Sequence, residues 1–526
     1  MRRVIAPLQY LIILGLTACS AVGLPSTPVE SRSTFQPDVS SDPPPTPTPL
    51  PPPEKTGEVE GTAPLTPTVE STPSPFPSFT GEPSTERIKY DFSVQVDYPR
   101  HQVAVEQTIT IPHPGQVILE EIVLVVPPRD WQGVFTLEAV SGGGGQPLRG
   151  YELERVKLRV PLEEPWLPGE TQTLQLAYRL DLPIQNAREG YGPSPFGYTS
   201  LQTNLVDWYP MVPPYQEGSG WVVHEPWIFG EYLVYPAADY DVSLLVTGGE
   251  EVVVAASAPD TLEANLRRYH LEEARNVVFS LSPAYQILEK QAAGTTLRAY
   301  VFPAYQESGK AALETTAAAL ELYQELYGPY RGASLTLIQA DFYHSMEFEG
   351  AYFLSRGFFD SWEGGARNFL TLIAAHETAH QWWYGRVGSD QALHPWMDEA
   401  LCTFSELVFY ETYHPDAVSW WWEARVDYYQ PEGVIDRSIY EFTGLGDNYL
   451  AYRDSTYLQG ARFMARLREA VGTEDFFAFL RDYAEAYDSD LASPEGFFDL
   501  LGEYHDLSDL DWLGEYFSEH PLRDPG

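Results

Sequence analysis

The sequence predicts a multi-domain protein in which an antiparallel β domain is followed by an α+β, mainly helical domain. Two changes of pattern lead to this fold class. Apolar and polar residues begin to alternate near Ile88, and apolar residues spaced three and four apart begin near Ser308. With 526 residues, 44% of them hydrophobic, the chain is long enough for more than one core. We expect the β domain at 87–290 and the helical domain at 291–526.

The N-terminal segment, residues 1–19, has the features of an export signal. A basic start precedes an apolar run from Val4 to Leu16, which is too short for a comfortable bilayer span, and small residues follow. Its ending "LTAC" resembles the bacterial lipobox, in which the cysteine is lipidated and becomes the mature N-terminus. The resemblance implies a lipid anchor at Cys19 that holds the protein on the extracellular side of a bacterial membrane. A plain signal peptide and a short membrane anchor are the alternatives.

Residues 20–86 are rich in Pro, Ser and Thr. Such a segment cannot bury enough apolar surface to offset its chain entropy, so we expect a disordered, semi-extended tether. An anchor followed by a tether predicts a protein that works outside the cell.

The charge balance excludes one class of partner. The formal net charge is −43, from 32 basic and 75 acidic residues. Nucleic-acid binding needs clustered Lys and Arg to contact phosphates, so we expect no nucleic-acid partner.

The elements follow in order along the chain. Short alternating runs such as "IKYDFSVQVDY", "QVAVEQTITIPH" and "TQTLQLAYRLDL" are separated by Gly, Pro and Asp, as in an antiparallel sheet or sandwich. Residues 308–328 then predict a helix that ends at Gly328, and "SLTLIQA" predicts a strand. Further helices are expected at 366–388 and from Pro395 to about Tyr413.

The stretch "AAHETAHQWWYG" carries the strongest chemical signal. On a helix, His376 and His380 project from one face, one turn apart, with Glu377 beside the first histidine. Zinc hydrolases need two neutral imidazoles, a third protein ligand, an open position for water, and a carboxylate that accepts the proton of that water. By itself the pattern is only moderately specific, and a solvated helix face is the alternative.

A third ligand is expected from the next helix. Glu399 follows His380 after 18 residues, on the helix opened by Pro395, and a loop between two helices can bring its carboxylate to the imidazoles. Glu406, seven residues after Glu399, is either a hydrogen-bond partner of a ligand histidine or part of a solvated helix face.

With these residues the sequence resembles the gluzincin aminopeptidases of the aminopeptidase N family. The family pattern is H-E-x-x-H, 18 residues, then E, and the flanking "HQWWYG" and "WMDEA" correspond to its "HQW(F)G" and "WLNEG". The resemblance implies one zinc ion bound by His376, His380 and Glu399, with Glu377 as general base. It also implies a saddle-shaped N-terminal β domain and a thermolysin-like catalytic domain.

Two further segments extend the resemblance. "STYLQGARF" resembles the family segment Y-x-K-G, which implies that Tyr457 stabilises the oxyanion, with Gln459 in place of the usual lysine and Tyr452 as a nearby helper. "HSMEFEG" resembles G-x-M-E-N, which implies that Glu347 binds the α-amine of the substrate. Because the family's N-terminal domain lends a Gln or Glu to the same amine site, Gln202 in "SLQTN" is a candidate there.

Departures from the family pattern keep other functions open. His344, Ser345 and Phe348 replace family residues around Glu347, and the chain after Tyr457 is too short for the large C-terminal helical domain of many relatives, so we expect an open cleft. The predicted function is a zinc aminopeptidase acting on extracellular peptides. The alternatives are a zinc endopeptidase or other amide hydrolase, and an anchored protein that binds zinc or peptides without catalysis.

Overall fold

The computed structural model describes residues 86–185, 194–228, 230–249, 251–443 and 447–518, all of which belong to one compact unit. The expected signal segment with Cys19, and the tether as far as residue 85, lie outside these residues. No helix within the described ranges is both long and apolar enough to cross a membrane.

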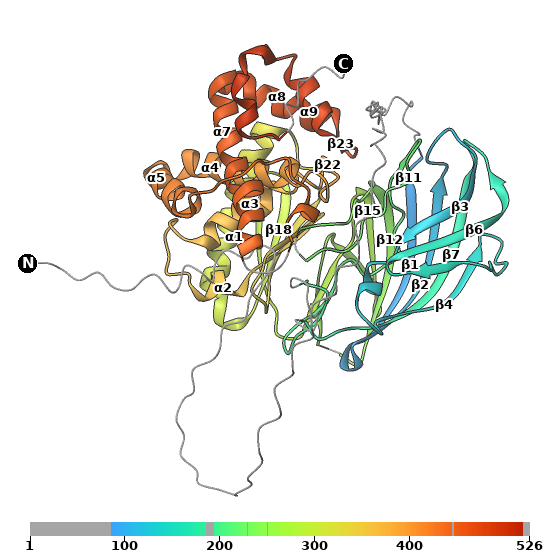
Figure 1. The fold of residues 1–526 in the computed structure, drawn as a ribbon. Coiled ribbons are helices and arrows are strands. Elements are labelled where there is room, and N and C mark those ends of the chain that lie inside the picture. The colour runs from blue at the N-terminus through green and yellow to red at the C-terminus, as the bar shows by residue number, and fades with distance from the viewer. Residues whose placement is uncertain (1–85, 186–193, 229, 250, 444–446, 519–526) are drawn as a thin grey trace, which may run out of the picture. The chain divides into compact units, whose positions relative to one another are not determined.

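A seven-stranded sheet dominates the N-terminal part (Figure 1). Its strand order is β14-β15-β12-β1-β2-β7-β4, and every neighbouring pair is antiparallel except β1 and β12. On β1, Tyr90, Phe92 and Val94 are buried between exposed polar residues, as the alternation predicts. The antiparallel β domain is thus confirmed, apart from that one parallel pair. The strands are β1 (Ile88–Asp97), β2 (Gln102–Pro112), β4 (Phe135–Gly142), β7 (Thr171–Asp181), β12 (Ala238–Thr247), β14 (Asp260–Glu263) and β15 (Leu266–Ala274).

Smaller sheets complete this β-rich part. Together with the large sheet they form one hydrophobic core, in which Trp166 and Trp208 are fully buried. One small sheet contains β3 (Leu119–Val125), β6 (Lys157–Trp166) and β5 (Glu152–Glu154), a second contains β13 (Val253–Ala256), β16 (Phe279–Ser282), β9 (Thr203–Leu205) and β8 (Gly197–Tyr198), and β10 (Tyr215–Gln216) pairs with β11 (Gly220–Trp221).

The second part is α+β, as expected, and starts with a five-stranded sheet. β17 begins at Gln286, upstream of the division that we expected at residue 291, because it pairs with β18 in this sheet. The strands in spatial order are β17 (Gln286–Ala292), β18 (Thr295–Val301), β19 (Ser334–Gln339), β21 (Ala351–Leu354) and β20 (Met346–Phe348), and a short pair joins β22 (Gly388–Ser389) to β23 (Leu491–Ala492).

Helices form the rest of this part and share a second hydrophobic core. The first helix ends at Tyr327, and Gly328 adopts a φ of 96°, which confirms the expected stop. Two of these helices, α4 and α7, pack closely on each other: a Cβ added to Gly460 of α7 would lie 2.5 Å from the Cβ of Ala400 on α4. The helices are α1 (Gln306–Tyr327), α2 (Arg356–Asp360), α3 (Phe369–Ala379), α4 (Trp396–Tyr413), α5 (Val418–Trp421), α6 (Asp447–Arg453), α7 (Gly460–Val471), α8 (Thr473–Ala486) and α9 (Pro494–Leu501).

The helix expected at 366–388 is shorter at both ends. α3 starts after Asn368, whose side chain accepts a hydrogen bond from the backbone N–H of Thr371 at 2.9 Å. It ends at Ala379 because the chain then turns, with the N–H of Gly385 donating to the carbonyl of His380 at 2.9 Å. The periodicity could not reveal this turn, since the residues after it are also apolar.

Candidate metal centre

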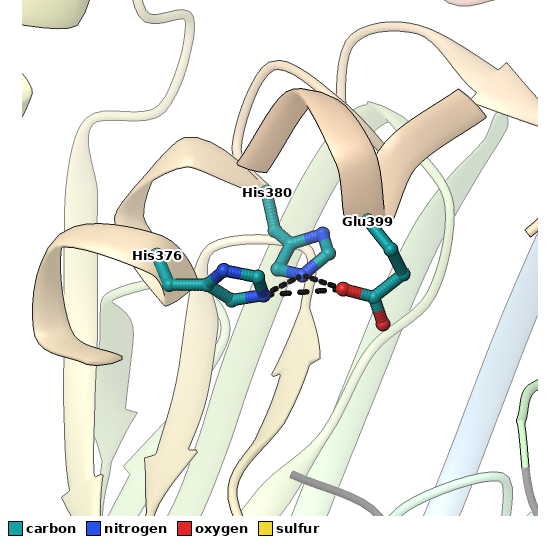
Figure 2. A group of neighbouring side chains, drawn as sticks. All are labelled: His376, His380 and Glu399. Carbon is teal, nitrogen blue, oxygen red and sulfur yellow. Dashed lines mark hydrogen bonds and ion pairs between the residues drawn. The ribbon is translucent and has the colours of Figure 1, made fainter. Parts of the chain in front are cut away.

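Two helices bring the predicted ligands together. His376 and His380 point from the C-terminal end of α3 toward Glu399 in the first turn of α4 (Figure 2). The Nε2 atom of His376 lies 3.1 Å from Oε2 of Glu399 and 3.2 Å from Nε2 of His380, and the third distance, His380 Nε2 to Glu399 Oε2, is 3.6 Å. All three side chains are buried.

These distances fit a single small metal ion. In tetrahedral zinc coordination with bonds of about 2.0–2.1 Å, two ligand atoms lie roughly 3.3 Å apart. The three measured separations of 3.1, 3.2 and 3.6 Å bracket that value. Two imidazoles and one carboxylate are also the donor set of catalytic zinc sites that leave a position for water. The residues therefore fit zinc.

Each histidine is oriented by an acceptor at its other nitrogen. Nδ1 of His376 lies 2.8 Å from Oε1 of Glu406, and Nδ1 of His380 lies 3.0 Å from the carbonyl oxygen of Trp383. An Nδ1–H that donates to these oxygens leaves the Nε2 lone pair of each ring facing the centre. This tautomer is the one that a metal needs.

Glu406 is itself fixed by a buried network, so it is not a solvated helix face. Arg425 donates to both of its carboxylate oxygens, at 3.0 and 2.9 Å, and the indole N–H of Trp421 donates at 3.0 Å. Glu406 and Arg425 are at most 3% exposed. The contribution of Arg425 could not be expected from the sequence, since it lies on a separate turn with no motif around it.

Replacing Glu406 with glutamine should weaken zinc binding about 10–100-fold, because the neutral amide holds the His376 imidazole less well. The melting temperature should also fall, since Arg425 loses the charge that compensates it in the interior. Zinc affinity can be measured by competition with a chromogenic chelator. Trp421→Phe is the matched control, since it removes one neutral donor to Glu406 and keeps both hydrogen bonds from Arg425. An unchanged zinc affinity in Glu406→Gln would contradict this role.

Glutamate carboxylates are concentrated around the centre. Carboxylate oxygens of Glu231, Glu347 and Glu399 lie within 4.8 Å of one another. Carboxylate oxygens of Glu347 and Glu377 also lie within 4.8 Å of each other and of a ring nitrogen of His380. Within the described part of the chain, Oε1 of Glu347 and Oε2 of Glu377 are buried without a hydrogen-bond partner. Burial raises the pKa of Glu377 to about 8, against the opposing charge of His380. So much buried negative charge needs cations, such as a metal ion and an ammonium group.

Tyr457 lies beside the ligands. It is carried by a π-helical turn, Asp454–Gln459, and such turns are frequent at functional sites. Its ring stacks on that of His376 at 6.1 Å, and its hydroxyl donates to Oε1 of Glu399. The ring of Tyr452 packs edge-on against Tyr457 at 5.9 Å. Gln459, in the place of the family lysine, faces outward near Arg462.

The structure places Glu347 at the centre but not Gln202. Glu347 lies on β20 and is 5% exposed. Gln202 is buried elsewhere: its amide N–H donates to the Tyr285 hydroxyl at 2.5 Å, and its carbonyl oxygen accepts from the N–H of Asp341. The structure therefore does not support the expected role of Gln202 in binding substrate, because both ends of its amide are hydrogen-bonded to other residues of the core. Glu231, a carboxylate of the N-terminal part, lies near Glu347 instead, and no spacing or motif distinguishes it in the sequence.

Two histidines and a glutamate on adjacent helices, with a second glutamate and a tyrosine beside them, define a zinc centre of the gluzincin type. Comparison with known proteins agrees with this class. Residues 311–517 match the Peptidase family M1 domain. This part of the chain therefore carries a Peptidase family M1 domain, in agreement with the resemblance to the aminopeptidase N family that the motifs indicate.

Solved structures support the two-part fold. An M1 zinc metallopeptidase from Deinococcus radiodurans is similar with a TM-score of 0.59 and 18% identity, over 83% of this chain and 95% of that chain. A mutant of the same enzyme bound to a Tyr-Ser-Ala substrate gives a TM-score of 0.58, over 84% and 97%.

Curated relatives match over a shorter stretch. Aminopeptidase M1-D and Aminopeptidase M1-A from Oryza sativa subsp. japonica are 23% and 24% identical over 228 and 224 residues. These stretches are 40% of this chain and 25% of each rice protein, so the chain spans about a quarter of the length of these relatives.

Proposed function

We propose that the protein is a zinc-dependent aminopeptidase that removes N-terminal residues from extracellular peptides. The observation that carries this proposal is the position of Glu347. Its buried carboxylate lies within 4.8 Å of the carboxylates of Glu231 and Glu399, the latter a metal ligand. A substrate ammonium held there would lie next to the metal ligands, so only the first peptide bond could reach them.

The chain's own residues divide the chemistry among them. Zinc, when bound by His376, His380 and Glu399, supplies Lewis acidity and lowers the pKa of water. Glu377 accepts the proton of the attacking water and passes it to the leaving amine. The Tyr457 hydroxyl, beside the ligands, donates a hydrogen bond to the oxyanion that develops on the scissile carbonyl.

The location and the anchor rest on the sequence alone. The basic start, the short apolar run and "LTAC" support lipidation of Cys19, and the Pro-rich segment supports a tether that keeps the enzyme off the membrane. Metabolic labelling of the expressed protein with a fatty-acid analogue would test the anchor, and Cys19→Ala should abolish the label.

A pair of substrates that differ in one group tests the aminopeptidase. We expect hydrolysis of a peptide with a free N-terminus and no hydrolysis of its N-acetylated twin, because acetylation removes the charge that Glu347 binds. Glu347→Gln should lower kcat/KM for the free peptide about 10–100-fold, the range for losing one charged hydrogen bond. Equal cleavage of both peptides would instead indicate an endopeptidase. Zinc-loaded protein that binds the peptides but cleaves neither would indicate a binding protein.

A further inference from the structure

A pocket with acidic and aromatic walls opens beside the metal centre. Glu231 and Glu347 line it on the side of the metal ligands, and Asp207, Tyr235 and Tyr384 line it as well. Glu347 is 5% exposed, and its Oε1 atom has no hydrogen-bond partner among the described residues. The pocket therefore starts where we place the substrate's ammonium group.

The charge of this pocket is of one sign. Among the described residues that line it, Asp207, Glu231 and Glu347 are the charged ones, and none is Lys, Arg or His. Asp207 accepts a hydrogen bond from the Tyr235 hydroxyl and forms no ion pair with any described cation. Desolvation raises its pKa to about 6, so it is still largely ionised at neutral pH. A carboxylate in such surroundings is stabilised by a cationic ligand.

The backbone holds this end of the pocket in a fixed shape. Tyr384 has a φ of 141°, a value that a bulky residue adopts only where the surrounding structure imposes it, and Asp207 has a φ of 49°, in the left-handed region that aspartate tolerates better than most residues. The Tyr384 hydroxyl accepts a hydrogen bond from the side-chain amide of Asn276. Burial raises the pKa of Tyr384, and the charges of Asp207 and Glu347 add to this shift, so both carboxylates lie near that hydroxyl.

Aromatic side chains supply the remaining walls. Trp131, Trp227 and Tyr232 line the pocket together with Tyr384. Such rings pack against the methylene stem of a long basic side chain, and their faces attract its charged head. A purely apolar side chain would also contact them, but it would leave Asp207 without a counter-charge.

We infer that this pocket receives the side chain of the substrate's first residue and that Asp207 selects a basic one, arginine or lysine. The inference rests on the proposed aminopeptidase function and names its substrate class. Asp207 acts as a specificity-determining residue, which binds the guanidinium or ammonium head and takes no part in the proton transfers.

Neutral analogues of the same shape test this selection. With the zinc-loaded full chain, kcat/KM for arginyl-aminomethylcoumarin should exceed that for citrullyl-aminomethylcoumarin about 10–100-fold, and lysyl should exceed norleucyl similarly, as for one charged hydrogen bond. Asp207→Asn should remove most of both ratios, because it should lower kcat/KM for the arginyl and lysyl substrates far more than for their neutral analogues. Asp91→Asn, an exposed acid on β1, controls for the change of net charge.

A binding measurement separates this inference from the proposed function. Argininamide should bind wild type about tenfold or more tighter than citrullinamide in calorimetry, and Asp207→Asn should bind the two alike. Preferred binding of argininamide without turnover of any substrate would overturn the aminopeptidase function but would support the acidic pocket as a site for a basic side chain. Hydrolysis with no preference for arginine over citrulline, or with a preference for leucyl or phenylalanyl substrates, would overturn the selection by Asp207.

Discussion

Glu377→Gln should reduce kcat about 10²–10⁴-fold while the protein still binds zinc in a 1:1 ratio. The amide has nearly the same size as the carboxylate, but it cannot accept a proton from water at neutral pH. Glu377 is not one of the three residues whose ligand atoms converge in Figure 2, so the metal should stay in place. Kinetics on a free-amine peptide, together with metal analysis of the same sample, measure both quantities.

The stability of this variant provides an independent check. Burial raises the pKa of Glu377 to about 8 in the metal-free protein. At a pH above the ordinary pKa of glutamate, the unfolded chain therefore ionises at this residue more readily than the folded chain, which lowers the free energy of unfolding. Glutamine removes that cost, and the metal-free variant should melt at or above the wild-type temperature at pH 7–8. Glu321→Gln, an exposed change on α1, should alter neither kcat nor melting. Full turnover by Glu377→Gln would place the general base elsewhere.

The ligands were predictable because they follow local rules. Two histidines four apart must share a helix face, and Pro395 marks the start of the helix that carries Glu399. What the spacing could not supply is the distance between the two helices. That distance depends on tertiary packing, since α3 and α4 belong to one hydrophobic core whose other members come from distant parts of the chain.

The surroundings of the site were harder to predict for the same reason. Arg425, Glu231 and Asp207 come from separate segments, and each meets the centre or its pocket only after folding. Gln202 shows the converse error: a polar residue in a suitable loop proves to be a buried hydrogen-bonding group of the core. Single residues far apart in sequence carry no periodicity or motif from which such contacts can be inferred.

Removing the metal should abolish activity and lower the melting temperature by several degrees. Without a cation, the carboxylates of Glu347, Glu377 and Glu399 remain together in the interior, and their mutual repulsion opposes folding. A metal that binds only the folded chain stabilises it by about 4 kcal/mol at a thousandfold excess over its Kd. Thermal melts with a chelator, and then with zinc restored, should therefore show a reversible shift that parallels the loss and return of turnover.

His380→Ala separates the effect of the metal from that of the chelator. With one of three ligands gone, zinc should bind at least about 10³-fold more weakly, since the remaining pair cannot complete a tetrahedral site. The melting temperature of this variant should no longer respond to zinc, whereas Glu377→Gln should respond as wild type does. This contrast assigns the shift to the ligand set of His376, His380 and Glu399 and not to metal bound by the acidic surface. A zinc-dependent shift that survives in His380→Ala would mean that the stabilising metal sits elsewhere on the chain.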